Sequence, residues 1–399
     1  MGSGELHFDV LENIRKHIDQ LLMGSGELHF DVLENIRKHI DQLRPWFPRQ
    51  AIICVGEYPI QILLKGPFVG KMDGTFPIFI DKSSEDIVKW SQSPLETDNI
   101  LGLDSKIDTH FLFHVLPHIT KNDTFIARLK NKPIEKLREA IMVSSIWDGI
   151  GSALLPTLIS QFKVWNMNLV ALAVLPSKLQ SSDVHFNAFS SMGICASTDF
   201  TPVLLIDRDQ LESYVGVDRK GSIIRGNIVI NYLLELMLAK ETFIQELSEL
   251  SRSFNVKLYA ILSATGASLN VYGSLENILN TALFRPLLTF DLSSASLVYV
   301  LLRIPLQLKD KLPRGKIELA VANWFKERAS LKSIYISDPI YVEDFSDRID
   351  VVMFVGGFDV TEMFASLEKE VSAIKNAAIE RGFFSENEWQ GIVKSLIQD

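Results

Sequence analysis

The chain has 399 residues, of which 47% are apolar and 22% charged, a composition that excludes disorder over most of its length. Its net charge of −9 argues against a general nucleic-acid-binding surface. The two cysteines cannot form a disulfide framework, the longest apolar runs are strand-sized, and the polar first 22 residues do not resemble a secretory signal. We therefore expect two domains in a soluble, cytoplasmic protein that neither binds nucleic acid nor inserts into a membrane.

The chain begins with a duplication, because residues 1–21 recur without a change as residues 23–43. Each copy predicts one short amphipathic helix, with Leu11, Ile14 and Ile18 of the first copy on one face. Natural repeats seldom stay identical, so a duplication introduced during cloning or gene prediction is one explanation for residues 1–44, and a real tandem helix is the other. For the second copy we expect a helix packed on the body of the protein, with an arm that docks on a neighbouring subunit as the alternative, and for the first copy disorder or an artefact.

From residue 45 to residue 226, strand-like and helix-like stretches alternate, which favours a parallel α/β sheet. Each strand-like stretch is a short apolar run. The predicted strands are 51–55, 76–80, 140–143, 169–175 and 202–206, with a helix over 154–162. This region is the predicted first domain.

A long, mostly apolar helix is predicted over 227–250, as a spine between two domains. Residues 251–359 mix strands with helices and form a predicted smaller α+β domain, with strands at 296–303, 333–336 and 351–355. The last part, 360–399, predicts two amphipathic helices over 360–379 and 386–397. No low-complexity linker separates these parts, so we expect the domains to pack tightly.

A glycine turn over 148–153 lies between a predicted strand and a predicted helix. Glycines in such a turn let the backbone approach a phosphate, and the helix N terminus supplies N–H donors. The turn is not a dinucleotide fingerprint, because the third glycine is missing and no acid follows Gly149 before Asp183. A phosphate loop and a plain tight turn remain alternative interpretations.

Three histidines, His110, His114 and His118, recur at helical spacing that would align them for a metal. Pro117 is expected to interrupt that helix, and the apolar neighbours Phe111 and Phe113 favour a core segment. We therefore predict no metal site here, and no nucleophile, base and acid set is legible elsewhere.

An ordered set of segments over residues 48–360 resembles the tubulin/FtsZ superfamily. The turn that starts at Gly149, with Gly-Ile-Gly-Ser-Ala, is similar to that family's signature GGGTGSG-type loop before its phosphate-binding helix. Four further segments resemble family motifs in the expected order: 174–183 the strand and loop V-P-S-P-K-x-S-D, 186–190 the motif Y-N-A-x-L-S, 205–211 the motif I-D-N-E-A-L, and 348–358 the last strand of the second domain.

The resemblance implies a Rossmann-like nucleotide-binding domain, a long central helix, a second smaller α+β domain and two C-terminal helices. It also implies GTP or GDP as ligand, with Mg²⁺ near Asp81 and the base near Asn231. The other implied nucleotide contacts are Gly56, Gln61, Gly149, Gly151, Ser152 and Asp207, with the phosphates on the turn from Gly149 to Ser152. The implied partner is another copy of the chain, bound head to tail.

Several residues depart from the family pattern at positions that bind phosphate or guanine. Trp147 and Asp148 stand where glycines are expected, and an acid beside a triphosphate repels it unless magnesium or protonation compensates. Pro59 removes one N–H donor from the first loop, and Arg208 replaces an Asn that reads guanine.

The segment that starts at Asn255 resembles the family's loop N-V-D-F-A-D, whose two acids reach the next subunit's nucleotide and polarise water. Lys257 and Ala260 replace those acids here. A lysine could contact a neighbour's γ-phosphate but cannot orient water as a carboxylate does. We therefore expect hydrolysis of GTP to be weak or absent.

Three functions follow as hypotheses. The first is a tubulin/FtsZ-like cytoskeletal protein that associates head to tail and is at most a weak GTPase. The second is a nucleotide-free interaction or scaffold protein that keeps the fold and regulates filaments of its relatives. The third is a nucleotide-dependent metabolic enzyme, ranked last because the ribose acid and an acid/base set are missing.

Overall fold

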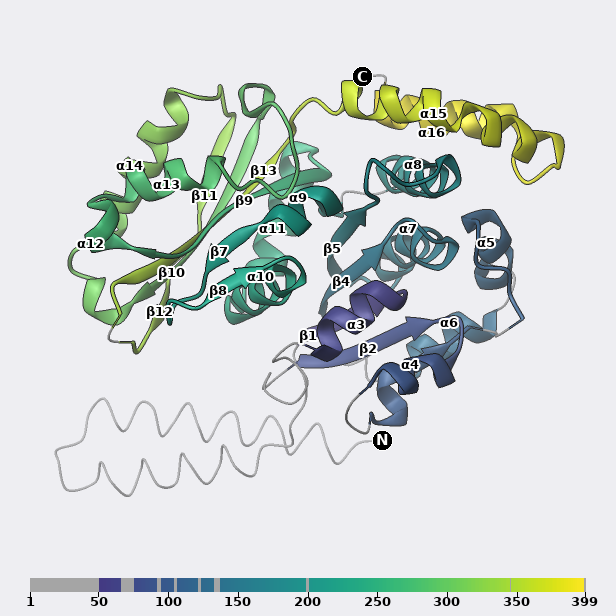
Figure 1. Cartoon of the computed structure of the whole chain (residues 1–399), viewed down its shortest axis with the longest axis horizontal. Helices are drawn as coiled ribbons and strands as arrows, with labels where there is room; N and C mark the ends of the chain where they lie inside the picture. The colour runs from purple at the N-terminus through teal and green to yellow at the C-terminus, as the bar shows by residue number, and fades with distance from the viewer. Residues whose placement is uncertain are drawn as a thin grey trace. The chain divides into compact units, whose positions relative to one another are not determined.

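The computed structural model describes residues 50–65, 75–91, 95–103, 106–120, 123–132, 137–198, 201–344 and 346–397, and the duplicated segment 1–44 lies outside them. Among these residues, one eleven-stranded sheet has the order β11-β10-β13-β9-β6-β5-β4-β1-β2-β3, with β12 beside β10 (Figure 1). The predicted α/β class is therefore confirmed.

The first part of the sheet is parallel throughout. Its strands are β1 (Gln50–Val55), β2 (Thr75–Asp81), β3 (Ile100–Gly102), β4 (Glu139–Ser145), β5 (Asn168–Leu175) and β6 (Val203–Asp207). Each predicted strand of this region is present. Apolar residues occupy both faces of β1, β4 and β5, as parallel strands covered by helices on both sides require.

Helices cover the two faces of this part of the sheet. They are α3 (Glu57–Lys65), α4 (Ser84–Trp90), α5 (Leu112–Thr120), α6 (Asp123–Lys130), α7 (Gly149–Val164), α8 (Ser182–Ser197) and α9 (Arg208–Ser213). Alternate residues of β1 enter two separate cores: Ala51 and Ile53 pack in the core that includes α7 and α8, while Ile52 and Cys54 pack in the core that includes α3.

The helix predicted over 227–250 is two helices, α10 (Asn227–Ala239) and α11 (Phe243–Phe254). The backbone turns at Lys240, which has extended dihedral angles of −94° and 95°. The Thr242 hydroxyl donates to Glu246 Oε1 at 2.6 Å at the start of α11. The predicted end at residue 250 therefore lies inside α11, and the loop after the first helix is 240–242.

The second part of the sheet continues the first, because β9 pairs with β6 in parallel. Its strands are β9 (Leu258–Ser268), β10 (Leu297–Pro305), β11 (Ser333–Ile336), β12 (Ile340–Val342) and β13 (Arg348–Gly356), and its helices are α12 (Leu269–Tyr272), α13 (Leu275–Leu283) and α14 (Arg314–Lys326). A two-stranded ribbon, β7 (Val215–Val217) and β8 (Ile223–Arg225), precedes α10.

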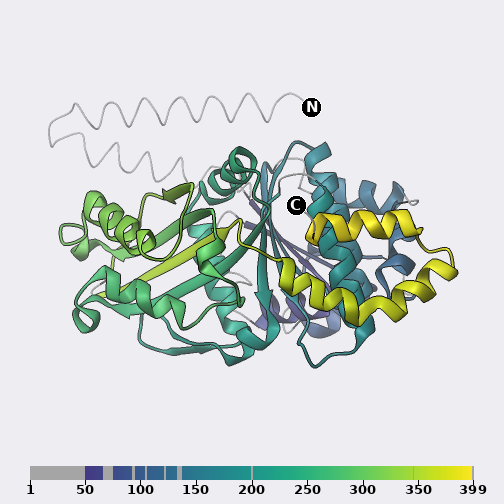
Figure 2. The same cartoon turned by 90° about the horizontal axis from the view of Figure 1, so that it is seen from above.

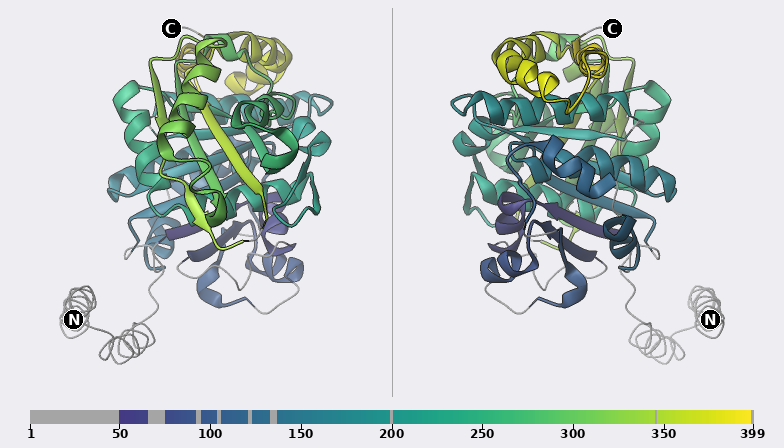
Figure 3. Two further views of the ribbon diagram at one scale, coloured as in Figure 1. Left: turned by 90° about the vertical axis from the view of Figure 1, so that its left-hand side faces the viewer. Right: turned by 90° about the vertical axis from the view of Figure 1, so that its right-hand side faces the viewer.

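The chain ends in α15 (Thr361–Glu380) and α16 (Glu386–Ile397), close to the predicted bounds. Both helices pack on α8 of the first part of the sheet, and Figures 2 and 3 show them lying beside each other. Trp389 of α16 stacks on Phe186 and Phe189 of α8, with ring centroids 5.7 Å and 5.2 Å apart. No helix in the described ranges has both the length and the apolarity to span a bilayer.

Candidate functional site: the crevice between β1 and β4

The strand order reverses at β1, whose neighbours are β2 on one side and β4 on the other. In open parallel sheets, ligands bind outside the carboxyl ends of the strands at such a switch point. Gly56 follows β1 with a φ of +87°, and its N–H donates to Ile80 O at 3.0 Å. A Cβ on Gly56 would lie 3.3 Å from Asp148 Oδ2, so the loops after β1 and β4 touch.

The N terminus of α7 faces this crevice, but its N–H groups are engaged inside the chain. Gly149 N donates to Thr109 O at 2.8 Å, Gly151 N donates to Asp148 Oδ1 at 2.7 Å, and Ser152 N donates to Asp148 O at 3.1 Å. The Ile150 N–H also bonds to the Asp148 carboxylate. The donors that hold a phosphate in sites of this type therefore already have acceptors.

The glycines of this turn are required for packing. A Cβ on Gly151 would lie 1.8 Å from Ser145 O, and one on Gly149 would lie 2.6 Å from Phe111 O. Ser144 Oγ also donates to Gly151 O at 3.0 Å. Close approach of α7 to β4 therefore explains both glycines without a ligand. Ser152 is fully buried.

Acidic groups gather at the mouth of the crevice. Burial raises the pKa of Asp148 to about 6, against the hydrogen bonds from Gly151 and Ile150 that lower it. Burial raises the pKa of Asp81 to about 7, and the nearby charges of Asp148 and Glu57 add to the rise. The predicted contact Gln61 lies on α3, where its amide donates to Glu57 Oε1 at 2.6 Å. The crevice is thus electronegative, which opposes a triphosphate.

An aromatic and cationic cluster crosses the crevice: Tyr58 on α3, Trp147 before α7 and Arg208 on α9. The Tyr58 and Trp147 rings meet edge to face at 4.7 Å, and the Arg208 guanidinium lies 5.1 Å from the Trp147 ring centroid. Tyr58 Oη donates to Asn227 Oδ1 at 2.6 Å, at the start of α10. Trp147 and Arg208 were recognised in the sequence as departures, whereas Tyr58 and Asn227 carried no motif that marked them.

Two of the predicted nucleotide-binding residues, Asn231 and Asp207, contact other parts of the chain. Asn231 is buried, and its amide donates to Ile62 O of α3 at 3.0 Å, so it joins two helices. Asp207, at the end of β6, accepts from Asp209 N at 2.8 Å as the N-cap of α9 and lines a separate cavity. The structure therefore brings Gly56, Asp81 and the 148–152 turn together and places Asn231 and Asp207 in other packing roles.

The predicted inter-subunit loop residues are engaged within the chain. Asn255 ends α11 in the left-handed conformation, and Ala260 is fully buried in β9. Lys257 Nζ donates to Thr198 O at 2.7 Å and to Ala196 O, at the carboxyl end of α8. The first helix of the predicted pair ends at Ala239 and is followed by the loop 240–242, so residues 255–260 come after the second helix, α11.

Two of the three histidines of the series lie beside different carboxylates. His110 Nε2 lies 2.8 Å from Asp183 Oδ2, and His114 Nδ1 lies 2.8 Å from Asp108 Oδ2. Pro117 lies inside α5 and does not interrupt it, contrary to the prediction. Within the described ranges, no group of three or more His, Cys, Asp or Glu side chains is arranged to hold a metal.

The crevice therefore lies at the switch point of a parallel α/β sheet, beside the N terminus of α7 and two acidic side chains. The sequence matches no protein-family model and no curated protein. Its fold matches CetZ from Methanosaeta thermophila strain DSM 6194 with a TM-score of 0.64 at 15% identity, over 84% of this chain and 93% of that chain.

Two further solved structures match. For GDP-bound CetZ1 from Haloferax volcanii the TM-score is 0.64 at 15% identity, over 82% of this chain and 99% of that chain. For a GTPγS-form protofilament of TubZ from Bacillus thuringiensis serovar israelensis, the TM-score is 0.56 at 13% identity, over 89% of this chain and 98% of that chain. The chain therefore has the tubulin/FtsZ fold, in a divergent form, as its ordered motifs predicted.

Proposed function

We propose that this protein is a tubulin/FtsZ-like cytoskeletal subunit of the cytoplasm that associates head to tail and whose nucleotide site is closed by its own residues. GTP or GDP, with Mg²⁺ near Asp81, binds weakly or not at all. The closed site is supported by the N terminus of α7, where the Asp148 carboxylate and the Thr109 carbonyl accept hydrogen bonds from the N–H groups that a phosphate would need.

Head-to-tail association is supported by the neighbours in fold. The TubZ structure is a protofilament, and so is a GTPγS-bound structure of CetZ2 from Haloferax volcanii. A contact between two different faces of one subunit produces a filament when its rotation does not close. We propose the same mode of association, and a role such as cell division, for the present chain.

Weak or absent hydrolysis is part of the same proposal. In the family, two acids of the loop after the central helix polarise the attacking water, whereas the loop 240–242 of this chain has a single acid, Glu241. The nucleotide would in addition have to displace Asp148 before any water could be oriented. Lys257 bears on the stability of α8 rather than on hydrolysis.

A nucleotide-free scaffold that regulates the filaments of relatives is the second candidate. The cluster of Tyr58, Trp147 and Arg208 favours it, because these side chains join the loops that would have to part around a nucleotide. Pelleting assays separate the candidates. A self-associating subunit pellets alone, whereas a scaffold pellets only with a related filament protein.

Nucleotide content is the first test. Protein purified without added nucleotide is denatured, and its supernatant is separated by ion-exchange chromatography. We expect no guanine nucleotide, and no uptake after addition of GTP and Mg²⁺. A near-stoichiometric peak of GDP or GTP would contradict the closed site.

Asp148→Ala tests the cause of closure. Removal of the internal carboxylate frees the Gly151 and Ile150 N–H groups, so we expect the affinity for GTP to rise by at least about tenfold, which corresponds to about 1.4 kcal/mol. The matched control is Ser274→Ala, which removes the side-chain cap of α13 outside the crevice and should leave GTP binding unchanged. Equal GTP affinity of wild type and Asp148→Ala would reject Asp148 as the closing group.

A further inference from the structure

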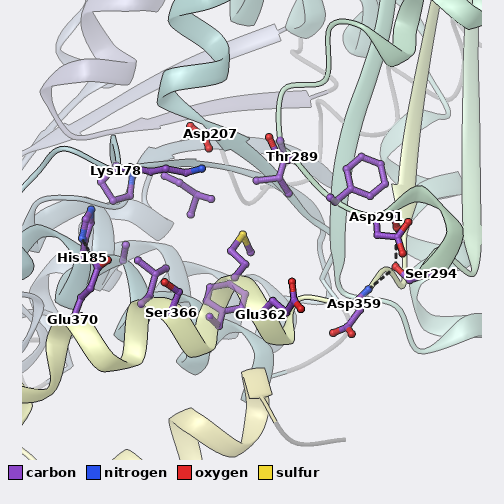
Figure 4. A pocket seen from close by; sticks show the side chains of 18 residues that line it. Lys178, His185, Asp207, Thr289, Asp291, Ser294, Asp359, Glu362, Ser366 and Glu370 are labelled. Atoms are coloured by element: carbon purple, nitrogen blue, oxygen red, sulfur yellow. Dashed lines mark hydrogen bonds and ion pairs between the residues drawn. The ribbon is translucent and has the colours of Figure 1, made fainter.

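A second cavity, separate from the crevice, has a volume of about 720 Å³ (Figure 4). It lies where the carboxyl ends of β5 and β6 meet α8, α15 and the loop 284–296. Its walls come from both parts of the sheet and from the C-terminal helix, and its volume falls within the roughly 300–1,000 Å³ of small-molecule sites. Junctions of this kind are preferred places for ligands.

The interior of this cavity is largely apolar. The apolar lining consists of Leu175, Pro176, Ala188, Leu288, Phe290, Met363, Phe364 and Leu367. These residues offer aromatic side chains, aliphatic side chains and the polarisable sulfur of methionine, which adapts to the shape of a ligand. A ligand with an apolar body therefore fits this surface.

The charges around the cavity are predominantly negative. Five carboxylates line it, against one lysine and one histidine: Asp207, Asp291, Asp359, Glu362 and Glu370, with Lys178 and His185. The histidine is itself paired with a carboxylate, because His185 Nδ1 lies 2.9 Å from Glu370 Oε2. Its Nε2 lies 3.0 Å from Ser177 O, so the ring is held on both sides by acceptors.

Asp291, Asp359 and Glu362 form an acidic edge of the cavity, and hydrogen bonds fix the first two of these residues. Asp291 Oδ1 accepts from Ser293 N at 2.9 Å, and Asp359 Oδ1 accepts from Thr361 N at 2.8 Å. Ser294 Oγ accepts from Asp359 N at 3.0 Å, which ties the loop to the start of α15. Figure 4 shows Asp291, Asp359 and Glu362 along one side, opposite Lys178 and His185. Hydrogen bonds to their side chains hold the pKa of Asp291 and of Asp359 below the usual range, so both are ionised near neutral pH.

We propose that this cavity binds a small organic cation with an apolar body, such as an aromatic amine. The ammonium group lies at the acidic edge of Asp291, Asp359 and Glu362, and the apolar body lies on the surface formed around Phe290 and Met363. The site is independent of the proposed nucleotide crevice. A bound cation would contact α15 and the loop 284–296 together, and so couple the C-terminal helix to the second part of the sheet.

Isothermal titration calorimetry of the full chain tests the site with three matched probes: 2-phenylethylamine, 2-phenylethanol and 3-phenylpropionate. We expect saturable binding of the amine, at least about tenfold weaker binding of the alcohol, and no binding of the acid, as expected for charge-assisted hydrogen bonds at an apolar site. Absence of amine binding, or equal binding of all three probes, would overturn the proposal.

Variants on α15 locate the binding. Glu362→Gln should weaken amine binding by about fivefold, as expected for loss of one partly exposed ion pair. The matched control is Glu368→Gln, which removes the same charge from the same helix outside the cavity lining. Ser366 lines the cavity and is exposed, so Ser366→Trp should fill the space and abolish binding while the circular dichroism spectrum stays unchanged. Amine binding that survives both Glu362→Gln and Ser366→Trp would place the ligand elsewhere and reject the site.

Discussion

At the scale of single residues, Asp148 changes what the crevice can hold. A carboxylate at a helix N terminus satisfies orphan N–H groups and complements the helix dipole, and its loss typically costs about 0.5–2 kcal/mol. In this chain the acceptor is a side chain of the protein itself, because Asp148 Oδ1 lies 2.7 Å from Gly151 N. A phosphate must displace it and must also approach Asp81 and Glu57. Internal capping and ligand binding therefore compete for the same donors.

The raised pKa of Asp81 predicts how the stability of the fold depends on pH. Its pKa is raised to about 7 in the folded chain, above the value of 3.8 for a free carboxyl, so folding favours the protonated form. The stability of the fold should therefore fall as pH rises from about 4 through about 7, by on the order of 2–4 kcal/mol from this group. Asp81→Asn should remove this part of the pH dependence, as measured by urea unfolding at pH 5 and pH 8.

The control for this experiment is Asp98→Asn, because Asp98 is a largely exposed carboxyl that pairs with Lys132 at 3.7 Å. It should leave the difference between the two pH values as in the wild type. If Asp81→Asn also leaves that difference unchanged, then Asp81 does not carry a raised pKa in the folded chain, and burial does not disfavour its carboxylate.

At the scale of elements, Lys257 acts on the end of α8. Its ammonium donates to carbonyls in the last turn and C-cap, where a cation also complements the helix dipole. Lys257→Met should lower the free energy of unfolding by about 1.5–3 kcal/mol, the range for hydrogen bonds to a charged group. Hydrogen exchange should accelerate at residues 194–198.

Lys326→Met is the matched control, since Lys326 is an exposed lysine in the last turn of α14. It should change the free energy of unfolding little. Loss of head-to-tail association in Lys257→Met without loss of stability would instead support the inter-subunit role that the sequence predicted for this lysine.

A buried charge network joins α10 to the second part of the sheet. Arg303 Nε donates to Asp350 Oδ2 at 2.7 Å and its Nη1 donates to Glu235 Oε1 at 2.8 Å, while Tyr232 Oη donates to Asp350 Oδ1 at 2.9 Å. Asp350→Ala leaves Arg303 buried without its partner, so the free energy of unfolding should fall by about 3–5 kcal/mol. Chemical denaturation measures this change.

The double variant Arg303→Met with Asp350→Leu should be more stable than Asp350→Ala, because no uncompensated buried charge remains. Arg314→Ala, which removes an exposed ion pair with Glu318, should be nearly neutral. A mild effect of Asp350→Ala would show that α10 is not fixed to the sheet by this network.

The strands and the glycine turn were predictable because their signals are local. Short apolar runs such as 51–55 and 169–175 must be buried on both faces, and the turn before α7 has its glycines in sequence. The break between α10 and α11 was not predictable, because Lys240, Glu241 and Thr242 include no Gly or Pro. The break is fixed by distant contacts, such as the bond from Gln50 Nε2 to Glu241 O at 3.3 Å. The partners of Lys257 and Asn231 likewise lie 59 and 169 residues away.

At the scale of the whole molecule, the parallel strands define two opposite edges that carry exposed apolar residues. Leu179 is 95% exposed and Phe284 is 83% exposed, and both flank α9 at the carboxyl edge. Val164, 75% exposed, ends α7 at the amino edge beside the start of β5. A heterologous, head-to-tail contact joins different faces of two subunits, so these side chains at opposite edges are the ones to test for it.

Blocking one edge at a time tests this arrangement. Leu179→Glu with Phe284→Glu should weaken self-association by about 100-fold, equivalent to about 3 kcal/mol of lost apolar burial, and Val164→Glu should weaken it from the other edge. Leu319→Glu, at a 62% exposed position on α14, is the control.

A mixture of the two blocked forms should yield heterodimers and nothing longer in sedimentation velocity, because each form keeps one complementary edge. A wild-type chain that stays monomeric at every concentration would refute self-association, and a mixture that forms long polymers would show that the contact uses other surfaces.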